Sequence, residues 1–271
     1  VTNLHHRIVH SREISNGADR QVTYHSRYHT ILATVLLSAS VSAQFRPPRS
    51  IIPNDQMPHA ENYLPDYYRP GDPQFLGDSV QYELGKAIRD TERGELAKAD
   101  ASTSLSYYLK RFGEVMGVPE MNSKDFPAVS EYVNVTFNQA RNSIQSTKNH
   151  FKRERPYSHF QQHSSLPDSE LQNDLTSYPS GHAVRAWAIA LALISVDPEH
   201  QDEILKVGYE MGQSRVIVGF HYQSDIDAAR MCASAAFARL CTEPAWQELF
   251  TAAKAEFQTY KSSQVPSETS D

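Results

Sequence analysis

The stretch that most constrains the fold of this chain is residues 183–196, which are apolar on almost every side. A helix that is apolar all round is a buried one. The polar turn Ser177-Tyr178-Pro179-Ser180-Gly181-His182 leads directly into it. We therefore expect the first turn of this helix deep in the protein, where backbone N–H groups lack partners and the helix dipole is little screened. Such a helix start binds anions.

Three residues of the turn suit an anion site. Ser180 is a candidate N-cap, Gly181 lets an oxyanion approach the backbone without a Cβ in the way, and His182 can give or take a proton near neutral pH. The alternative is that Pro179-Ser180-Gly181 forms only a turn and a cap, because such dipeptides commonly break regular structure.

The remaining chain reads as helices, with no alternating strand pattern and no internal repeat. This predicts an all-α fold, a helical bundle around the buried central helix. The charged segment at 91–97 is expected to be a helix end or a loop. The other helices are predicted at residues 75–91, 101–112, from 125 along an apolar stripe to 144, 199–218, 223–241 and 244–260.

The domain organisation follows from composition along the chain. Residues 31–41 are an apolar run between Arg27 and the small residues up to Ala43, the layout of a signal peptide with cleavage near Ala43. We thus expect a periplasmic or secreted protein, with an uncleaved anchor or a core helix as the alternative. The predicted parts are a leader and signal peptide at 1–43, a proline-rich extended arm at 44–74, a helical domain at 75–260 and a polar tail at 261–271.

Composition also limits the partners. The net charge is -6 and the arginines are dispersed, so nucleic acid is not expected as a partner. After residue 43 no run of about 20 apolar residues occurs, so no integral membrane association of the mature protein is expected. Cys232 and Cys241 lie nine residues apart on one predicted helix, about 13 Å along its axis, which argues against a disulfide. The extended arm is long enough to reach a second subunit, so a homo-oligomer is one possible state of the protein.

A second cluster of interest is Lys148 and Arg155-Pro156. Lys148 continues the apolar stripe that ends at Ile144, and seven residues of continuous helix would bring Arg155 to the same face. Pro156 disfavours helix at Arg155 and so places it at a helix end. The alternative is a solvated basic run, in which Lys152 and Arg153 are expected to be exposed.

The third cluster is Ser214-Arg215, His221 and Asp225. His221 and Asp225 are four residues apart, a spacing that puts two side chains on one side of a helical turn. A carboxylate bound to one imidazole nitrogen leaves the other as a directed lone pair, which a nucleophilic histidine requires. A purely structural His–Asp pair is the alternative. Together, two histidines, three cations and a helix start are what phosphoryl transfer through a covalent intermediate needs.

These clusters carry a resemblance to a known family. Lys148-x6-Arg155-Pro156, Pro179-Ser180-Gly181-His182 and Ser214-Arg215-x5-His221-x3-Asp225 are similar to the three motifs of the type 2 phosphatidic acid phosphatase (PAP2) superfamily, which includes vanadium haloperoxidases. The residues around them, and the segment from Arg89 to Ala97, resemble class A nonspecific acid phosphatases. The resemblance covers about residues 61–258.

The resemblance implies an acid phosphatase of this helical type, acting on a broad range of small phosphomonoesters, with phosphotransferase side activity. It implies that His221 attacks phosphorus, Asp225 orients it, and His182 protonates the leaving group. Lys148, Arg155, Ser180, the Gly181 N–H and Arg215 would hold the phosphate. No metal and no cofactor are implied, and an acid optimum and vanadate inhibition are expected. The alternatives are a vanadium-dependent haloperoxidase, a membrane lipid phosphatase and a catalytically silent phosphate-binding protein.

Overall fold

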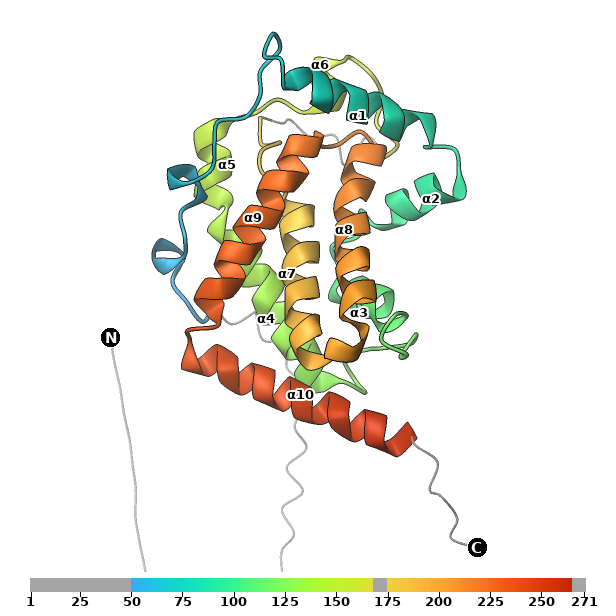
Figure 1. Ribbon diagram of the computed structural model, residues 1–271, viewed down its shortest axis with the longest axis vertical. Helices are drawn as coiled ribbons and strands as arrows, with labels where there is room; N and C mark the ends of the chain where they lie inside the picture. The colour runs from blue at the N-terminus through green and yellow to red at the C-terminus, as the bar shows by residue number, and fades with distance from the viewer. Residues whose placement is uncertain (1–49, 168–174, 265–271) are drawn as a thin grey trace, which may run out of the picture. The chain divides into compact units, whose positions relative to one another are not determined.

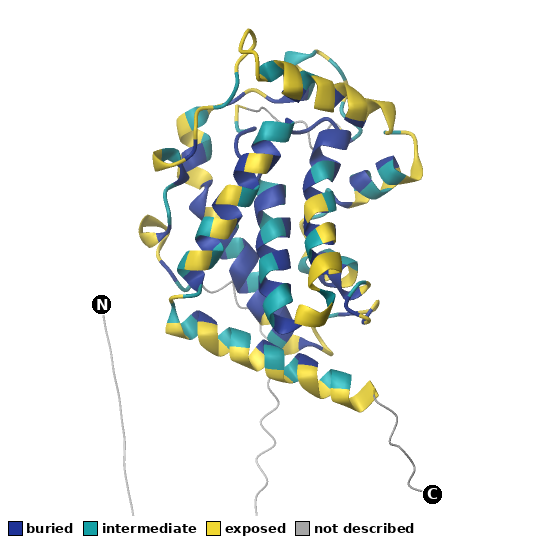
Figure 2. Ribbon diagram, viewed as in Figure 1, coloured by how far each residue is buried: buried dark blue, intermediate teal, exposed yellow. Residues whose placement is uncertain are grey.

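Helix α7 (Gly181–Val196) is the central element of the computed structural model, which describes residues 50–167 and 175–264. It lies among α4 (Pro127–Ser143), α8 (Gln201–Ile217) and α9 (Gln223–Leu240). Most of its side chains are buried, as the dark blue ribbon in Figure 2 shows. The predicted buried central helix is confirmed. The leader at 1–43 and the polar tail from residue 265 onward lie outside the described residues.

Small residues let α7 and α8 approach closely. A Cβ built on Gly208 of α8 would lie 2.7 Å from the Cβ of Ala190 and 3.2 Å from the carbonyl oxygen of Ala186, both on α7. A Cβ contact of 2.7 Å essentially never occurs in real structures, so the spacing of the two helices requires a glycine at position 208. The close approach brings together the two helices that carry His182 and Arg215.

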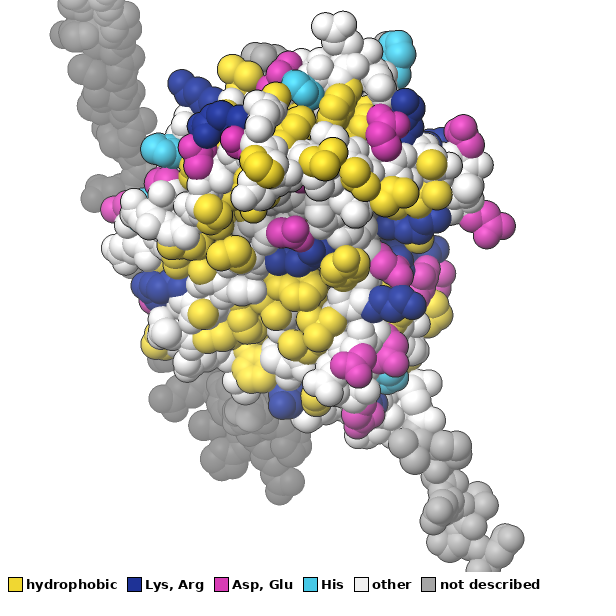
Figure 3. Space-filling model, turned by 45° about the horizontal axis from the view of Figure 1, so that its top comes forward, with side chains coloured by type: hydrophobic (Ala, Val, Ile, Leu, Met, Phe, Trp, Pro, Cys, Tyr) yellow, Lys and Arg dark blue, Asp and Glu magenta, His cyan; other side chains and the backbone are white. Residues whose placement is uncertain are grey.

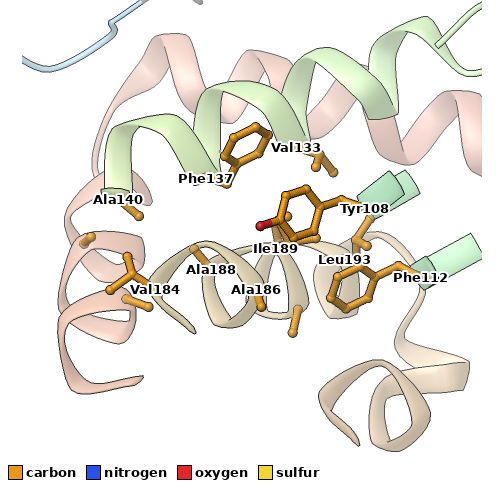
Figure 4. Packing of buried hydrophobic residues seen from close by; sticks show 14 of the residues in the cluster. Tyr108, Phe112, Val133, Phe137, Ala140, Val184, Ala186, Ala188, Ile189 and Leu193 are labelled. Atoms are coloured by element: carbon orange, nitrogen blue, oxygen red, sulfur yellow. The ribbon is translucent and has the colours of Figure 1, made fainter. Parts of the chain in front are cut away.

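The apolar stripe predicted from residue 126 to 144 is also confirmed, since all of its apolar members are buried. In Figure 4, Val133, Phe137 and Ala140 of α4 point toward α7, and Tyr108 of α3 (Leu105–Gly113) fills the space beside them. The rings of Tyr108 and Phe137 lie 5.6 Å apart. This packing orients the end of α4 toward the start of α7.

The outer elements close the bundle. α10 (Pro244–Gln264) crosses one end, and the chain between residues 50 and 74 forms only short 3-10 turns, η1 (Asn54–Gln56) and η2 (Ala60–Asn62). No strand occurs in the described ranges, so the predicted all-α class is confirmed. The remaining elements are α1 (Phe75–Ala87), α2 (Glu92–Ala99), α5 (Gln145–Phe151), α6 (Pro156–His159) and η4 (Pro198–His200).

Several boundary predictions were wrong. The helix expected at 75–91 ends at Ala87, and the one expected at 101–112 begins at Leu105. The segment expected to be a helix end or loop at 91–97 is helix α2, because Thr91 caps it by accepting a hydrogen bond from the backbone N–H of Gly94. The last helix was expected to end at 260, and it continues to Gln264 through polar residues that keep helical backbone.

Helix α1 has a buried face and an exposed apolar face. Asp78, Tyr82 and Gly85 are buried against the bundle at spacings of four and three residues. The opposite face turns hydrophobic side chains outward, and Figure 3 shows such side chains interspersed with charged ones on this end of the molecule. The exposed apolar residues of this face are Leu76, Val80, Leu84 and Ile88. The inward face matters for the site because it carries a buried carboxylate, Asp78.

A search of the described helices for a stretch both long and apolar enough to span a bilayer finds none.

The close contact of α7 and α8 predicts a difference between two glycine substitutions. Gly208→Ala should lower the free energy of unfolding by about 1–3 kcal/mol, because the new methyl group overpacks Ala190. Gly77→Ala on α1 meets nothing within 4 Å and should raise it by about 0.5–1 kcal/mol. Urea unfolding of the two variants measures both effects, and equal shifts would contradict this account of the packing.

Candidate active site

One cavity of about 300 Å³ brings together residues from distant parts of the chain. Five residues singled out from the sequence line it: Lys148, Arg155, Gly181, His182 and His221. They come from α5, from the start of α6, from the start of α7 and from the turn between α8 and α9. The volume is at the lower end of the range of about 300–1,000 Å³ usual for small-molecule pockets.

The start of α7 has the geometry of an anion-binding helix terminus. Ser180 is the N-cap, and its side chain accepts a hydrogen bond from the backbone N–H of Ala183 at 3.4 Å. Gly181 is the first helical residue and lines the cavity. A Cβ built on Gly181 would meet the protein only at Cε of Lys148, 3.8 Å away, an ordinary contact. A side chain at position 181 would therefore project into the cavity, and its absence leaves that space open next to the positive end of the helix.

His221 has a defined tautomer. Its Nδ1 lies 3.1 Å from Oδ2 of Asp225, and its Nε2 lies 3.0 Å from Nη1 of Arg155. A guanidinium can only donate, so Nε2 accepts and Nδ1 carries the proton that is donated to Asp225. Burial and then Arg155 lower the pKa of His221 well below its usual value, against the opposing effect of Asp225. The ring is thus neutral near pH 7, with a lone pair on Nε2 beside a cavity cation.

His182 is held in the opposite way. Its Nε2 lies 3.0 Å from the carbonyl oxygen of Ala101, which precedes α3. A carbonyl can only accept, so Nε2–H donates to it and Nδ1 is the atom that can gain or lose a proton. Burial, then Arg215 and then Arg185 lower the pKa of His182 well below its usual value. The two imidazoles line the same cavity and differ in the partner that fixes each ring.

Lys148 and Arg155 reach the cavity by a route other than the predicted one. α5 ends at Phe151 because Lys152 adopts the left-handed conformation with φ 48°, so no continuous helix joins the two residues and that part of the prediction was wrong. Arg155 is instead the extended residue before Pro156, at the start of α6. Its Nη1 also donates to the carbonyl oxygen of Phe220 at 3.1 Å, and Lys148 Nζ donates to the carbonyl oxygen of Thr176.

Three predicted residues are fully buried beside the cavity and are not among those that line it. Arg215 has its guanidinium 4.9 Å from the centre of the Phe220 ring and is close enough to lower the pKa of His182. Ser180 donates its backbone N–H to the carbonyl oxygen of Asp225 at 3.1 Å. Asp225 accepts from His221 and, at 2.6 Å, from the hydroxyl of Ser177. The start of α7 is therefore tied directly to the start of α9.

Sequence reasoning missed a further residue of the site, Arg153, which was expected to be exposed and is 2% exposed. Its Nη1 donates to Asp225 at 2.7 Å, and its Nη2 donates to Asp78 of α1 at 2.8 Å. The guanidinium lies 3.9 Å from the centre of the Tyr222 ring. Although burial raises it, Arg153 and then His221 hold the pKa of Asp225 well below its usual range. Arg153 thereby keeps the partner of His221 ionised.

A local signal for Arg153 exists in the sequence. Pro156 favours an extended backbone at Arg155, and extended chains point alternate side chains to opposite sides. Arg153 and Arg155 are buried, whereas Glu154 between them is exposed. Reading residues 153–155 with a period of two, in place of the helical period, would have put Arg153 on the side of Arg155.

Comparisons with known proteins identify the family of this chain. Residues 129–248 match the model of the PAP2 superfamily. The chain is 36% identical over 239 residues to a non-specific acid phosphatase of Providencia stuartii, covering 84% of this chain and 96% of that protein. It is 36% identical over 200 residues to one of Salmonella typhi, covering 70% and 76%. A third, from Salmonella typhimurium, is 33% identical over 238 residues, covering 82% and 89%. The chain therefore belongs to the PAP2 superfamily, among the non-specific acid phosphatases.

The buried pairing of Arg153 predicts that its fork geometry matters as well as its charge. Arg153→Lys keeps the charge but cannot donate to Asp78 and Asp225 in the same bidentate manner. We expect a loss of about 1–3 kcal/mol in the free energy of unfolding and a lower kcat with little change in KM. Urea unfolding and steady-state kinetics measure these effects, with Arg239→Lys, at a half-buried ion pair with Glu243 away from the cavity, as the control. Unchanged kcat in Arg153→Lys would contradict a positioning role.

Proposed function

We propose that this phosphatase hydrolyses phosphate monoesters through a phosphohistidine formed on Nε2 of His221. The single observation that supports this most is the fixed tautomer of His221, with Nδ1–H donated to Asp225 and Nε2 accepting from Arg155. A histidine held in this way presents its lone pair where the cations of the cavity would hold an anion. The relatives' shared name, acid phosphatase, agrees with such chemistry.

The phosphoryl group would bind between the helix start and the cations. Lys148 and Arg155 line the cavity, and the N–H of Gly181 is at the positive end of α7. Arginine can bind two phosphate oxygens at once, while lysine acts as a point charge. The guanidinium of Arg215 and the hydroxyl of Ser180, both buried beside the cavity, would complete the phosphate-binding site. On binding, Arg155 would donate to a phosphate oxygen in place of Nε2 of His221, which frees the nucleophile.

The first step would then form the bond from Nε2 of His221 to phosphorus and break the bond from phosphorus to the leaving oxygen. The bonding electron pair goes to that oxygen, which takes the proton from Nδ1 of His182. The carboxylate of Asp225, ionised because of Arg153, balances the positive charge that develops on the His221 ring. The cations stabilise the equatorial oxygens as charge builds up on them.

In the second step, Nδ1 of His182 would take a proton from water as the water oxygen attacks phosphorus. The Nε2–phosphorus bond breaks and its electron pair returns to His221. An alcohol in place of water would give the phosphotransferase side activity. In this scheme the protein's own cations carry the charge of the phosphoryl group, with no metal or cofactor. A cavity of about 300 Å³ suits small phosphomonoesters of varied organic groups.

We further propose that the protein acts in the periplasm or after secretion. The support is the signal-peptide pattern at residues 27–43, which lies outside the described residues.

The covalent intermediate gives the decisive test. Full-length protein mixed with phosphate-labelled 2,4-dinitrophenyl phosphate and quenched rapidly should carry acid-labile, base-stable label. His221→Ala should carry none, and its kcat should fall at least about 10³-fold. His182→Ala should carry more label than the unaltered protein, because water activation is slowed more than attack. Vanadate, which mimics the five-coordinate phosphoryl group, should inhibit. Label that persists in His221→Ala would exclude this nucleophile.

The pH dependence follows from the neighbours of His182. Burial, Arg215 and Arg185 lower its pKa, so in the free enzyme the acid form is lost as pH rises at values below those of an ordinary imidazole. We expect kcat/KM for an alkyl phosphate to fall as pH rises through values below the ordinary imidazole pKa of 6.5, and His182→Ala to cost about 10²–10⁴-fold at acid pH. With 2,4-dinitrophenyl phosphate, whose leaving group needs no proton, both effects should be much smaller. Initial-rate profiles for the two substrates measure this, and equal losses would contradict the acid role.

A further inference from the structure

Two arginines that the proposed reaction does not use line the same cavity. Arg185 is on α7, four residues after Gly181, and Arg141 is in the last turn of α4. Four residues of helix advance about 6 Å along the axis and about 40° around it beyond a full turn. Arg185 is therefore one turn farther along nearly the same face of α7 as the helix start that would bind the phosphoryl group.

Neither arginine has a carboxylate partner in residues 50–167 or 175–264. Arg141 donates one hydrogen bond, to the side chain of the adjacent Asn142 at 3.2 Å. Arg185 makes no hydrogen bond or ion pair there; its Nε is buried without a partner and its guanidinium lies 5.9 Å from the centre of the Phe137 ring. The contrast is with Arg111, which is similarly enclosed and pairs with Glu210 at 3.2 Å.

The two guanidinium groups also act on each other. Burial lowers the pKa of Arg185, and Arg141 lowers it further, against the opposing effect of Tyr108. A guanidinium does not lose its proton in proteins, so Arg185 stays charged in spite of this. Two like charges held partly buried without a counter-ion are destabilising, and an anion placed between them removes that cost.

We propose that Arg141 and Arg185 form a second anion subsite, which binds a phosphate group carried by the leaving group of the substrate. This inference rests on the proposed function, because it assigns the leaving-group side of the same cavity. A phosphate monoester carries about -1.5 to -2 charges at pH 7 and accepts two forked guanidinium groups, which a carboxylate with a single charge matches less well. The substrate class is thus bisphosphates, in which one phosphate reacts at His221 while the other is held one helical turn away.

The reaction itself is unchanged by this assignment. The scissile phosphoryl group goes to Nε2 of His221, and the leaving oxygen, attached to the second phosphate through its organic linker, takes the proton of His182. The subsite contributes to substrate binding, so we expect it to lower KM for a bisphosphate and to change kcat little.

The test compares alkanediol bisphosphates of increasing linker length with alkyl monophosphates of the same length. The unaltered protein should prefer at least one bisphosphate by about tenfold in kcat/KM, beyond the factor of two for its two equivalent ends, with the gain in KM. Arg185→Gln and Arg141→Gln should each reduce this ratio several-fold. The ratio is the readout, since it cancels any general effect of either substitution on the site.

Arg239→Gln is the matched control, because Arg239 is on α9, pairs with Glu243 beyond the end of that helix, and does not line the cavity. It should leave the ratio unchanged. Arg185→Gln removes a cation without a partner, so urea unfolding should show no loss of stability. The inference is overturned if the unaltered protein shows no preference, if the preference survives in both cavity variants, or if Arg239→Gln reduces it equally. A failure of the proposed function would look different, as absence of monophosphate turnover or of label on His221.

Discussion

The carboxylate of Asp225 is the interaction on which the arrangement of this site depends. It accepts from the His221 ring, from the hydroxyl of Ser177, from Arg153 and from the backbone N–H of Tyr222, while the backbone carbonyl of the same residue accepts from Ser180. A carboxylate has about four acceptor positions, so it is saturated. One buried side chain thus joins the start of α9, the loop before α7 and the segment that follows α5. An unpaired charge at this depth would be strongly destabilising, and these partners make its burial tolerable.

The partners of the two imidazoles separate their chemical roles. His221 donates to an ionised carboxylate, which favours positive charge on that ring as it takes on phosphorus. His182 donates to a neutral carbonyl and has Arg215 and Arg185 nearby, which favour loss of its proton. The first ring is therefore suited to act as a nucleophile and the second to act as an acid. In the proposed reaction, a carboxylate on one side and cations on the other would give two identical side chains different roles.

The sequence was informative where one local pattern decides the structure. Residues 183–196 have apolar side chains in all directions, and burial of α7 follows from that alone; the stripe from 126 to 144 does the same for α4. Arg153 shows the limit. The local pattern can place Arg153 on the side of Arg155, but it cannot identify the partner that Arg153 binds there, Asp78, which lies 75 residues away on α1. The prediction of a continuous helix from Lys148 to Arg155 was wrong because Lys152, in the left-handed conformation, ends α5. Lysine rarely adopts this conformation, so its residue type did not indicate the end of the helix.

The cations of the cavity have two opposing effects on the proposed reaction, and substrate binding reconciles them. They attract a phosphate dianion, while burial, and then the nearby charges of Arg215 and Arg185, lower the pKa of His182 in the free protein. A bound dianion would compensate the cationic part of this effect and so raise the pKa of His182 in the complex. Substrate binding and proton uptake by the acid are thus coupled by linkage. The site would become competent for leaving-group protonation mainly when the phosphoryl group is in place, and acid conditions would favour both events together.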